Sequence, residues 1–310
     1  MPVTLATSNI NSVRLRIRLV TRFLRLYQPD ILCLQEIKCL DEQFPRKALV
    51  RAGYPHMAVH GQKGYHGVAI VSKFPLTDVT SRVFCEIDHA RHVSARLDLG
   101  HGPVTLHNFY IPAGGDEPDP LLNPKFKHKL DFLAELKTWF AEQAFAERQL
   151  ICGDFNIAPH ENDVWSHKQL LRVVSHTPVE TQALDELLTG GYGWVDLVRK
   201  HFPYDQKLYT WWSYRSPDWR AADKGRRLDH IWSTTDLGAH AIGADVVREA
   251  RGWGSRPSDH VPVLVRFRLP ADPDDATMYP DHAAGTAPLR ESSNAGSGDA
   301  GEGVNRSPGG

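Results

Sequence analysis

The segment Gln-Leu-Ile-Cys-Gly-Asp-Phe-Asn-Ile-Ala-Pro, residues 149–159, is the most informative stretch of this chain. Its apolar start predicts a buried strand, and Pro159 marks the turn that follows. Asp154 and Asn156 are two residues apart, so an extended backbone places both side chains on one face. Gly153 allows a ligand or a neighbouring backbone to approach closely. A strand end followed by an Asx turn would explain this segment equally well, so the rest of the chain must decide between the two.

The composition predicts a globular protein. With 310 residues, 41% of them hydrophobic, the chain can bury a sizeable core as one large domain or two ordinary ones. No apolar run approaches the roughly 20 residues of a membrane span, and residues 3–10 form an alternating strand without a signal-peptide pattern. We therefore expect a cytoplasmic protein without membrane insertion. The cysteines contain no Cys-x-x-Cys pair, which favours buried free thiols over disulfides or zinc at Cys33, Cys39, Cys85 and Cys152.

Charge is unevenly distributed along the chain. Seven of the 37 acidic residues but only two of the 36 basic residues fall within residues 270–310. Residues 1–269 therefore carry 34 basic and 30 acidic residues, a mild excess that is compatible with a polyanionic partner. The terminal segment is mostly Ala, Gly, Asp, Ser and Pro, and it cannot offset its ordering entropy by burial. We predict a catalytic domain over residues 1–269 and a disordered acidic tail over residues 270–310.

Strand and helix patterns alternate through the first 269 residues, which predicts a layered α/β domain with its chemistry at one edge of the sheets. The predicted helices span about residues 13–27, 41–52, 125–148 and 181–188, and the predicted strands span about residues 3–10, 31–34, 68–72, 92–99, 104–110, 149–156, 209–215 and 263–269, with one more starting at Asp229.

Four arginines follow one face of the first predicted helix at i, i+4, i+8 and i+11. They are Arg14, Arg18, Arg22 and Arg25. Such a row suits phosphate groups, although a solvated helix face is the commoner explanation. Arg14 lies nearest the end of the first strand and is the strongest candidate for a substrate contact.

Polar side chains gather at the ends of the predicted strands. They are Asn9, Glu36, Tyr110, Asp154, Asn156, Asp229, Asp259 and His260. Four carboxylates without a Cys or paired-His ligand set favour a hard cation bound by oxygen, magnesium or manganese. Such an ion suits phosphate hydrolysis. Asp259-His260 adds an acid/base candidate, although Ser-Asp-His before a strand can also be a simple turn.

Eight short motifs, taken in order, resemble the exonuclease III family of abasic-site endonucleases over about residues 1–269. The motifs are Asn-Ile-Asn (9–11), Leu-Gln-Glu-x-Lys (34–38), Gly-Gln-Lys-Gly (61–64), Tyr-x-Pro-x-Gly (110–114), Gly-Asp-Phe-Asn (153–156), Trp-Trp-Ser-Tyr-Arg (211–215), Arg-Leu-Asp (227–229) and Ser-Asp-His-x-Pro (258–262). The resemblance implies a four-layer α/β sandwich, in which two packed mixed sheets are flanked by helices. It also implies metal-dependent hydrolysis of DNA phosphodiesters, 5′ to an abasic site or at a 3′ terminus.

The resemblance also implies roles for individual residues. Tyr110 would stabilise the phosphate or assist the leaving group, and His260, paired to Asp229, would contact a phosphate oxygen or activate water. Asp154 would transfer a proton, and whether Asp154 or His260 is the base stays open. Asn9 and Asn156 would hold the scissile phosphate, beside a metal on Glu36 and a second or alternate metal position at Asp259. The implied metal-site residues are Asn9, Glu36, Asp154, Asn156 and Asp259.

A pocket for an extruded sugar or a frayed terminal nucleotide is expected around Trp211 and Leu228. Because Trp211 and Trp212 alternate across a strand, one of the two is expected in the core. The remaining expected substrate contacts are Arg14, Lys63, Tyr65 and Arg215. Two positions depart from the family pattern: Arg226 replaces a bulky apolar residue beside the pocket, and Ser12 replaces a glycine.

The expected partner is double-stranded DNA with abasic sites or 3′ ends, bound by a monomer that uses Mg²⁺, with Mn²⁺ able to substitute. Within the same fold, a phosphatase or phosphodiesterase acting on a lipid or other non-DNA phosphoester is the alternative. A non-enzymatic DNA-binding protein derived from a nuclease would require losses among the site residues. Glu36, Asp154, Asn156 and His260 are all present, which argues against that class.

Overall fold

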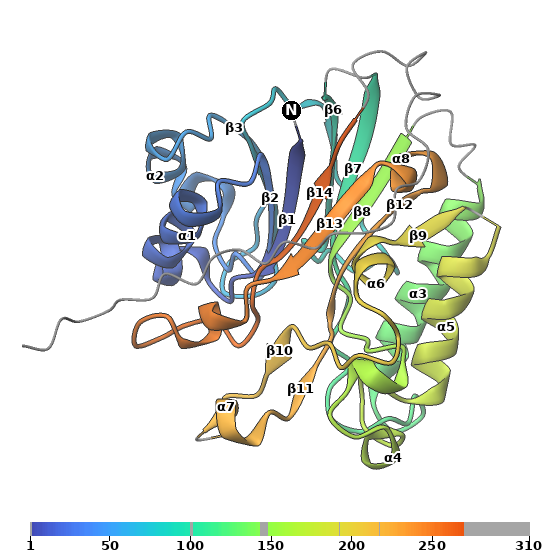
Figure 1. Ribbon diagram of the computed structural model, residues 1–310. Coiled ribbons are helices and arrows are strands. Elements are labelled where there is room, and N and C mark those ends of the chain that lie inside the picture. The colour runs from blue at the N-terminus through green and yellow to red at the C-terminus, as the bar shows by residue number, and fades with distance from the viewer. Residues whose placement is uncertain (1, 100–101, 143–147, 192, 217, 270–310) are drawn as a thin grey trace, which may run out of the picture. The chain divides into compact units, whose positions relative to one another are not determined.

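The computed structural model describes residues 2–99, 102–142, 148–191, 193–216 and 218–269, which belong to one compact unit (Figure 1). The predicted tail, residues 270–310, lies outside the described residues. Within the described ranges, no helix combines the length and the apolar character needed to cross a membrane.

The first sheet has six strands in the order β13-β14-β1-β2-β4-β3. Its strands are β1 (Val3–Asn9), β2 (Ile31–Gln35), β3 (His56–His60), β4 (Val68–Ser72), β13 (Ala241–Val246) and β14 (Val263–Phe267). β1 and β2 run parallel because helix α1 (Val13–Tyr27) returns the chain between them, and the other neighbours pair antiparallel.

The second sheet also has six strands, in the order β5-β6-β7-β8-β12-β9. Its strands are β5 (Thr77–Thr80), β6 (His92–Asp98), β7 (Pro103–Tyr110), β8 (Arg148–Asp154), β9 (Trp194–Asp196) and β12 (Asp229–Thr234). β7 and β8 are parallel and are joined through helix α3 (Pro124–Glu142), so each sheet contains one parallel crossover beside the site described below.

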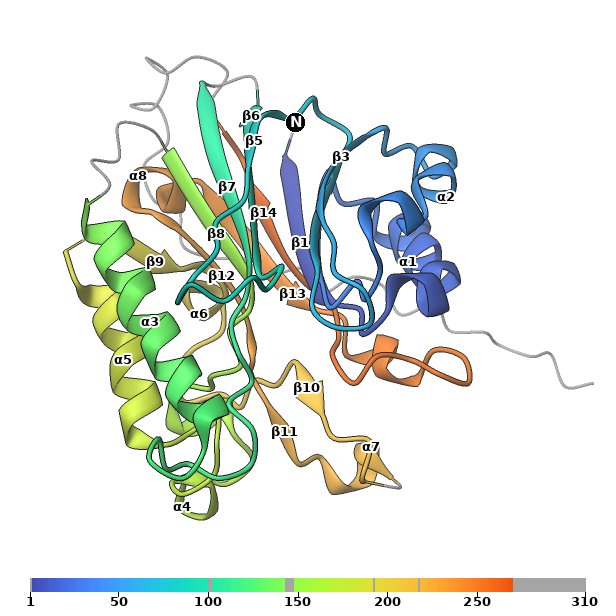
Figure 2. The same ribbon diagram turned by 180° about the vertical axis from the view of Figure 1, so that it is seen from behind.

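Helices cover the outer faces of both sheets. α1 and α2 (Arg46–Arg51) lie against the first sheet, and α3 and α5 (Pro178–Thr189) lie against the second (Figures 1 and 2). The shorter elements are α4 (His167–Leu170), α6 (Leu197–His201), α7 (Trp219–Ala222), α8 (Thr235–Ala239), the 3-10 turns Asp41–Gln43, Glu161–Asp163 and Arg248–Gly252, and the hairpin strands β10 (Trp211–Trp212) and β11 (Gly225–Arg226). The predicted four-layer α/β sandwich is confirmed.

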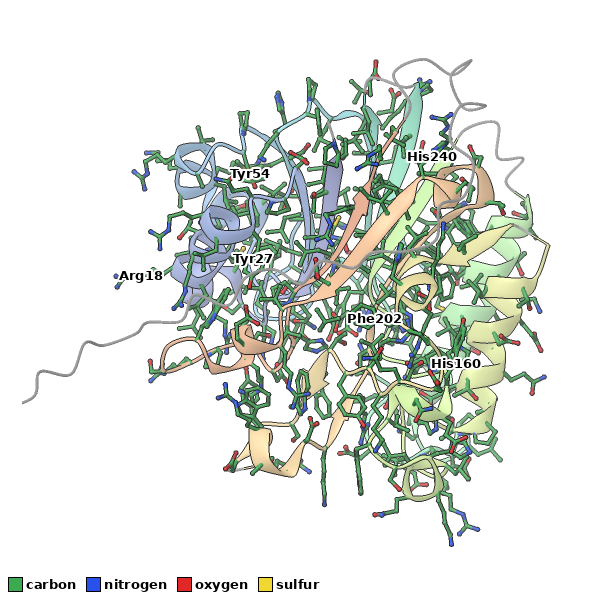
Figure 3. The ribbon with its side chains drawn as sticks, in the orientation of Figure 1. Arg18, Tyr27, Tyr54, His160, Phe202 and His240 are labelled. Atoms are coloured by element: carbon green, nitrogen blue, oxygen red, sulfur yellow. The ribbon has the colours of Figure 1, made fainter. Side chains whose placement is uncertain are left out.

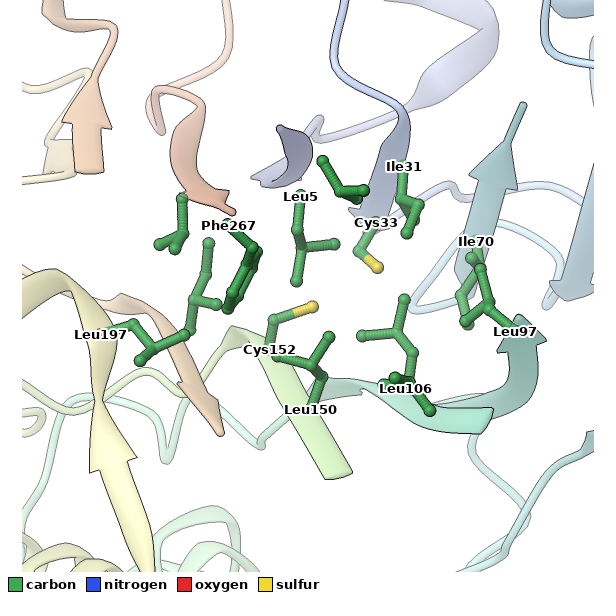
Figure 4. Packing of buried hydrophobic residues seen from close by; sticks show 14 of the residues in the cluster. Leu5, Ile31, Cys33, Ile70, Leu97, Leu106, Leu150, Cys152, Leu197 and Phe267 are labelled. Carbon is green, nitrogen blue, oxygen red and sulfur yellow. The ribbon is translucent and has the colours of Figure 1, made fainter. Parts of the chain in front are cut away.

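The inner faces of the two sheets pack on each other through apolar side chains (Figure 4). Leu5 and Cys33 from the first sheet face Leu106, Leu150 and Cys152 from the second, and all five are almost fully buried. Burial of each leucine contributes about 1.5–3 kcal/mol to folding. All four cysteines are free thiols, as predicted; Cys33, Cys39 and Cys152 are buried, whereas Cys85 is half-buried.

Three predicted elements differ from the structure, and several strands were not predicted. The strand expected over residues 209–215 is reduced to the two residues of β10, Trp211–Trp212. The helix expected over 41–52 is broken at Pro45, which lacks a backbone N–H, so a 3-10 turn precedes the short helix α2. The helix expected to reach residue 148 ends at Glu142 in the described part of the chain, and Arg148 opens β8. Strands β3, β5, β9 and β13 were not predicted, because they are short or half-exposed and carry little apolar alternation.

The buried face of α1 also differs in detail. Val13, Val20 and Leu24 are buried as predicted, but Phe23 and Arg16 replace Ile17 and Tyr27 among the most buried positions. Arg16 is buried because its guanidinium donates to the Arg256 carbonyl at 2.9 Å and to the Tyr214 hydroxyl at 3.2 Å. Partners so distant in sequence leave no trace in helical periodicity.

Candidate active site

Strand topology brings the predicted polar residues to one edge of both sheets, beside the β10–β11 hairpin in Figure 1. Asn9 ends β1 opposite Gln35, which ends the parallel strand β2. In the second sheet Asp154 pairs with Tyr110 on one side and with Asp229 on the other. The central strand β8 therefore ends between two functional side chains.

Asn9 joins the two sheets at this edge. Its amide nitrogen Nδ2 donates to Glu36 Oε1 and to Asp154 Oδ2, both at 2.9 Å. The Tyr110 hydroxyl donates to the same Glu36 oxygen at 2.8 Å. Asn156 donates through its backbone N–H to Asp154 Oδ1 at 2.9 Å and through Nδ2 to Oδ2 at 3.2 Å. The predicted amides, phenol and acids thus form one connected network.

His260 bridges two carboxylates of the second sheet. Its Nδ1 lies 2.9 Å from Asp229 Oδ2, and its Nε2 lies 3.6 Å from Asp154 Oδ2. Asp229 Oδ2 also accepts a 2.6 Å hydrogen bond from the Thr210 hydroxyl. Ser258 holds the turn before His260, since its hydroxyl donates to the Asn9 carbonyl at 2.7 Å and accepts from the His260 N–H at 3.2 Å. The imidazole orientation is therefore set from both sides.

The protonation of this pair follows from its surroundings. Burial raises the pKa of Asp154 to about 7, although the neighbouring imidazole opposes the shift. Burial alone would lower the pKa of His260, but the Asp229 and Asp154 carboxylates outweigh it and raise that pKa to about 10. The two carboxylates thus favour the charged imidazole of His260, while burial moves the titration of Asp154 toward neutral pH.

The Glu36 carboxylate already binds one cationic group, the ammonium of Lys38. The Lys38 ammonium is 2.7 Å from Glu36 Oε2 and donates to Asn11 Oδ1 at 2.7 Å. Asn11 Nδ2 donates in turn to Asp259 Oδ1 at 3.2 Å. Although burial favours the neutral acid, the Lys38 charge lowers the pKa of Glu36. A carboxylate that stays ionised and already attracts an ammonium group suits a hard cation.

A second group of possible metal ligands is more buried than Glu36. One ligand atom from each of Asp154, Asp229 and His260 lies within 4.8 Å of the others, and all three residues are buried. The other carboxylate oxygen of Asp229, Oδ1, is buried without a hydrogen-bond partner among the described residues. The site edge therefore offers carboxylate oxygen for a metal ion at Glu36 and at this buried cluster.

Tyr110 is held as a neutral donor. Burial and the nearby Glu36 carboxylate raise its pKa well above the usual value, so it keeps its proton. Arg91 fixes the ring, because its guanidinium carbon lies 4.9 Å from the ring centre and its Nη1 donates to the Tyr110 carbonyl at 3.1 Å. His66 Nε2 lies 2.9 Å from Arg91 Nη2.

Backbone geometry at the site is unusual. Glu36 has φ 50° and Asn156 has φ 55°, and such left-handed conformations of non-glycine residues cluster at functional sites. Ser12, the departure noted in the first turn, has φ 85°, a conformation that glycine adopts more readily. Lys129 supports the Asn156 turn by donating to its carbonyl at 2.8 Å.

The predicted pocket residues lie beside the site. Trp211 is half-buried and its indole nitrogen donates to Asp259 Oδ2 at 3.0 Å. Trp212 is 1% exposed and is the core member of the pair, as the alternation predicted. Leu228 is buried in a small apolar cluster that Trp211 packs against.

The other predicted substrate contacts are exposed side chains at the periphery of this network. They are Arg14 in the first turn of α1, Lys63 and Tyr65 in the loop before β4, and Arg215 after β10. The arginine row continues outward along the helix, and Arg18 extends away from α1 into solvent (Figure 3).

Six supporting residues were not predicted. They are Asn11, Lys38, Arg91, Lys129, Thr210 and Ser258. Asn11, Lys38 and Ser258 belong to the short motifs themselves, so closer attention to those motifs would have found them. Arg91 and Thr210 carry no local signal, because their partners come from other strands.

Comparison with known proteins gives a consistent result. Residues 6–260 match the model of the Endonuclease/Exonuclease/phosphatase family. The chain is 32% identical over 270 residues to exodeoxyribonuclease III of Haemophilus influenzae, which covers 84% of this chain and 98% of that protein. An AP endonuclease from Archaeoglobus fulgidus superposes with a TM-score of 0.78 at 31% identity, covering 86% of this chain and 99% of that one. The 3′ phosphatase NExo from Neisseria, bound to a product DNA hairpin, superposes with a TM-score of 0.77 at 32% identity and the same coverage.

Proposed function

Because the chain belongs to the endonuclease/exonuclease/phosphatase family, we propose that it is a metal-dependent DNA phosphodiesterase of base-excision repair. It cleaves 5′ to abasic sites, removes nucleotides and blocking groups from DNA 3′ ends, or does both. The observation that carries this proposal is the imidazole of His260 between the Asp229 and Asp154 carboxylates, at an edge shared with Asn9 and Glu36. The exodeoxyribonuclease III, AP endonuclease and 3′ phosphatase activities of the similar proteins support DNA as the substrate.

Asp154 is the general base in this proposal. Its pKa of about 7 lets it accept a proton from water near neutral pH, where His260 is already protonated. The Asn9 and Asn156 amides orient the Asp154 carboxylate. Deprotonation of the attacking water by Asp154 would then produce the nucleophile.

In this proposal two hydrogen-bond donors hold the phosphate, the charged imidazolium of His260 and the neutral hydroxyl of Tyr110. The His260 imidazolium provides a charged N–H at Nε2, and Asp229 keeps the ring in place through Nδ1. Tyr110 keeps its proton and donates to Glu36 Oε1, so its hydroxyl is a second donor at the same edge. Charge that develops on the phosphate oxygens meets these groups already oriented, which lowers the cost of reorganisation.

Glu36 and the nearby Asp259 are the residues proposed to hold a divalent cation, with Mg²⁺ preferred and Mn²⁺ able to substitute. Their donor atoms are carboxylate oxygens, and the Lys38 ammonium already lies at the Glu36 carboxylate. A bound cation would supply charge neutralisation for the phosphate and the leaving oxygen. We propose a monomer as the active unit.

A labelled duplex with a single internal abasic analogue, run beside a duplex with a recessed 3′ end, tests the proposal. Each is incubated with Mg²⁺ or with a chelator, and the products are resolved by length. A metal-dependent cut at the analogue or metal-dependent shortening from the 3′ end is expected. Absence of both products, with activity on a lipid or soluble phosphoester instead, would replace DNA as the substrate.

A further inference from the structure

Arg226 is a half-buried cation beside the predicted pocket. It ends strand β11 and pairs with Trp211 across the hairpin. Its guanidinium carbon lies 5.3 Å from the centre of the Trp211 ring. The indole nitrogen of Trp211 donates to Asp259, so the same ring contacts Arg226 and the carboxylate edge of the candidate active site.

The Arg226 guanidinium connects the hairpin to a second loop. Its Nη1 donates to the Val174 carbonyl at 3.0 Å and to the Ser175 hydroxyl at 2.7 Å. The loop carrying these acceptors is itself tied to the segment after β8, because the Ala158 N–H donates to the Ser175 carbonyl at 2.8 Å. Arg226 therefore lies across the space between the hairpin and this loop.

The loop that accepts Arg226 is held rigidly. The Ser175 N–H donates to both carboxylate oxygens of Glu180, at 3.0 and 2.9 Å. Glu180 forms a fully buried ion pair with Lys129 at 2.5 Å, and Lys129 donates to the Asn156 carbonyl at 2.8 Å. The position of Arg226 is thus coupled to the Asn156 turn, because withdrawal of the loop would disturb a buried ion pair.

The charge on Arg226 is incompletely compensated. Its Nε atom is buried and has no hydrogen-bond partner among the described residues, and the carboxylate that acts on its charge, Glu180, is already paired with Lys129. Its neighbours Trp211 and Leu228 belong to an apolar cluster. A half-buried cation in such surroundings gains from an anionic ligand nearby.

We propose that Arg226 makes a 3′-terminal phosphate the preferred group at this site over an internal abasic sugar. The proposal rests on the DNA phosphodiesterase function proposed above and specifies its substrate. An extruded sugar would have to enter the space beside Trp211 and Leu228 that Arg226 crosses. A terminal phosphate has no sugar on that side, and at neutral pH it carries close to two negative charges, against one for a phosphodiester.

The reaction on this substrate is a simple hydrolysis. The oxygen of water forms a bond to phosphorus while the bond between phosphorus and the 3′ oxygen breaks. One proton from that water passes, through the base, to the 3′ oxygen. The products are inorganic phosphate and a 3′-hydroxyl end, and no oxidant or co-reactant is consumed.

The test compares kcat/KM for two duplexes with the full-length protein and Mg²⁺. One duplex carries a 3′-phosphate at a nick, and the other carries an internal tetrahydrofuran abasic analogue. The variants are Arg226→Leu, which removes the charge, and Arg226→Gln, which keeps a donor for the Val174 carbonyl. Arg220→Leu is the matched control. Arg220 is exposed on α7, between β10 and β11, and its guanidinium carbon lies 5.4 Å from the centre of the Trp219 ring.

We expect the wild-type protein and Arg220→Leu to favour phosphate release. Arg226→Leu should lower the ratio of phosphate release to internal incision by roughly tenfold or more, as loss of a charge-assisted contact implies. Arg226→Gln should shift the ratio the same way, and it serves as the deciding variant if the leucine protein melts before assay.

Two results would overturn the inference. One is a wild-type protein that cuts the abasic analogue faster than it releases phosphate, and the other is an unchanged ratio in a folded Arg226→Gln protein. Either leaves the DNA phosphodiesterase function intact. A wild-type protein that is inactive on both duplexes would instead remove that function.

Discussion

His260 Nδ1 lies 2.9 Å from Asp229 Oδ2, and both side chains are buried. Asp229 begins a strand of the second sheet, whereas His260 precedes β14 of the first sheet, so this contact joins the two layers at the site. The charge of the imidazolium depends on Asp229, because the pKa of His260 is raised against the effect of burial. The protonation of His260 and the packing of the two sheets are therefore linked.

Asp154→Asn is expected to lower kcat by about 10³-fold, in the range of general-base removal. The DNA dissociation constant should change by less than about threefold, since the amide occupies the same space. Asp185→Asn, an exposed acid of α5, is the control. Single-turnover rates and binding to uncleaved duplex measure the two quantities, and turnover near that of the wild type would remove the base role.

Glu36→Gln should raise the Mg²⁺ concentration needed for half-maximal activity by tenfold or more, because a carboxylate ligand is replaced by a neutral amide. The change keeps an acceptor for Asn9 and Tyr110. Titration of activity against Mg²⁺ gives the answer, with Glu42→Gln, an exposed acid, as the control. If the two titrations coincide with that of the wild type, Glu36 is not a ligand.

Stability should fall as the solution becomes acidic. Burial lowers the pKa of His107 to about 4 from its ordinary value of 6.5, so only the unfolded chain takes up this proton between those pH values. The contribution is complete above pH 6.5 and is lost on acidification to about pH 4, amounting to about 3 kcal/mol. Urea unfolding from pH 7.5 to 4.5 measures the slope, which His107→Gln should reduce. An identical slope in the variant would contradict the assignment.

Asp163→Asn should destabilise the fold by about 3–5 kcal/mol, because it leaves buried arginine charge uncompensated. Asp163 pairs with Arg199 at 2.6 Å and Arg227 at 2.8 Å, and all three side chains are fully buried. Asp131→Asn breaks the exposed pair with Lys127 and should cost less than about 1 kcal/mol. Denaturant midpoints measure both, and equal losses would show that burial does not govern this ion pair.

Deletion of residues 270–310 should leave the thermal transition and the turnover unchanged. Leu269, the last described residue, still packs in the core between the sheets, so the truncation keeps that contact. Melting followed by circular dichroism and the 3′-end assay measure the two properties. A melting temperature lower by several degrees would assign the tail a structural role.

Much of the fold and site could be predicted because their signals are local. Apolar alternation marks long strands such as β1 and β7, and the polar residues that end them mark the catalytic edge. The edge strand β5 escaped prediction because all of its residues are exposed, so it has no buried face to impose alternation. The break at Pro45 was visible in the sequence but was outweighed by helical periodicity on both sides.

The functional groups of the site could be predicted from the residue types at strand ends. Asp154, Asn156 and Asp259-His260 provide acid, amide and imidazole groups, and no distant residue is needed to identify them. The contacts that these side chains make could be found only in the folded structure. Lys129 reaches the Asn156 turn from a helix, and Arg226 reaches a loop 51 residues earlier in the sequence. The reason is physical: local periodicity reports which face of an element is buried, whereas the partner of a buried charge is chosen by the packing of elements far apart in the chain.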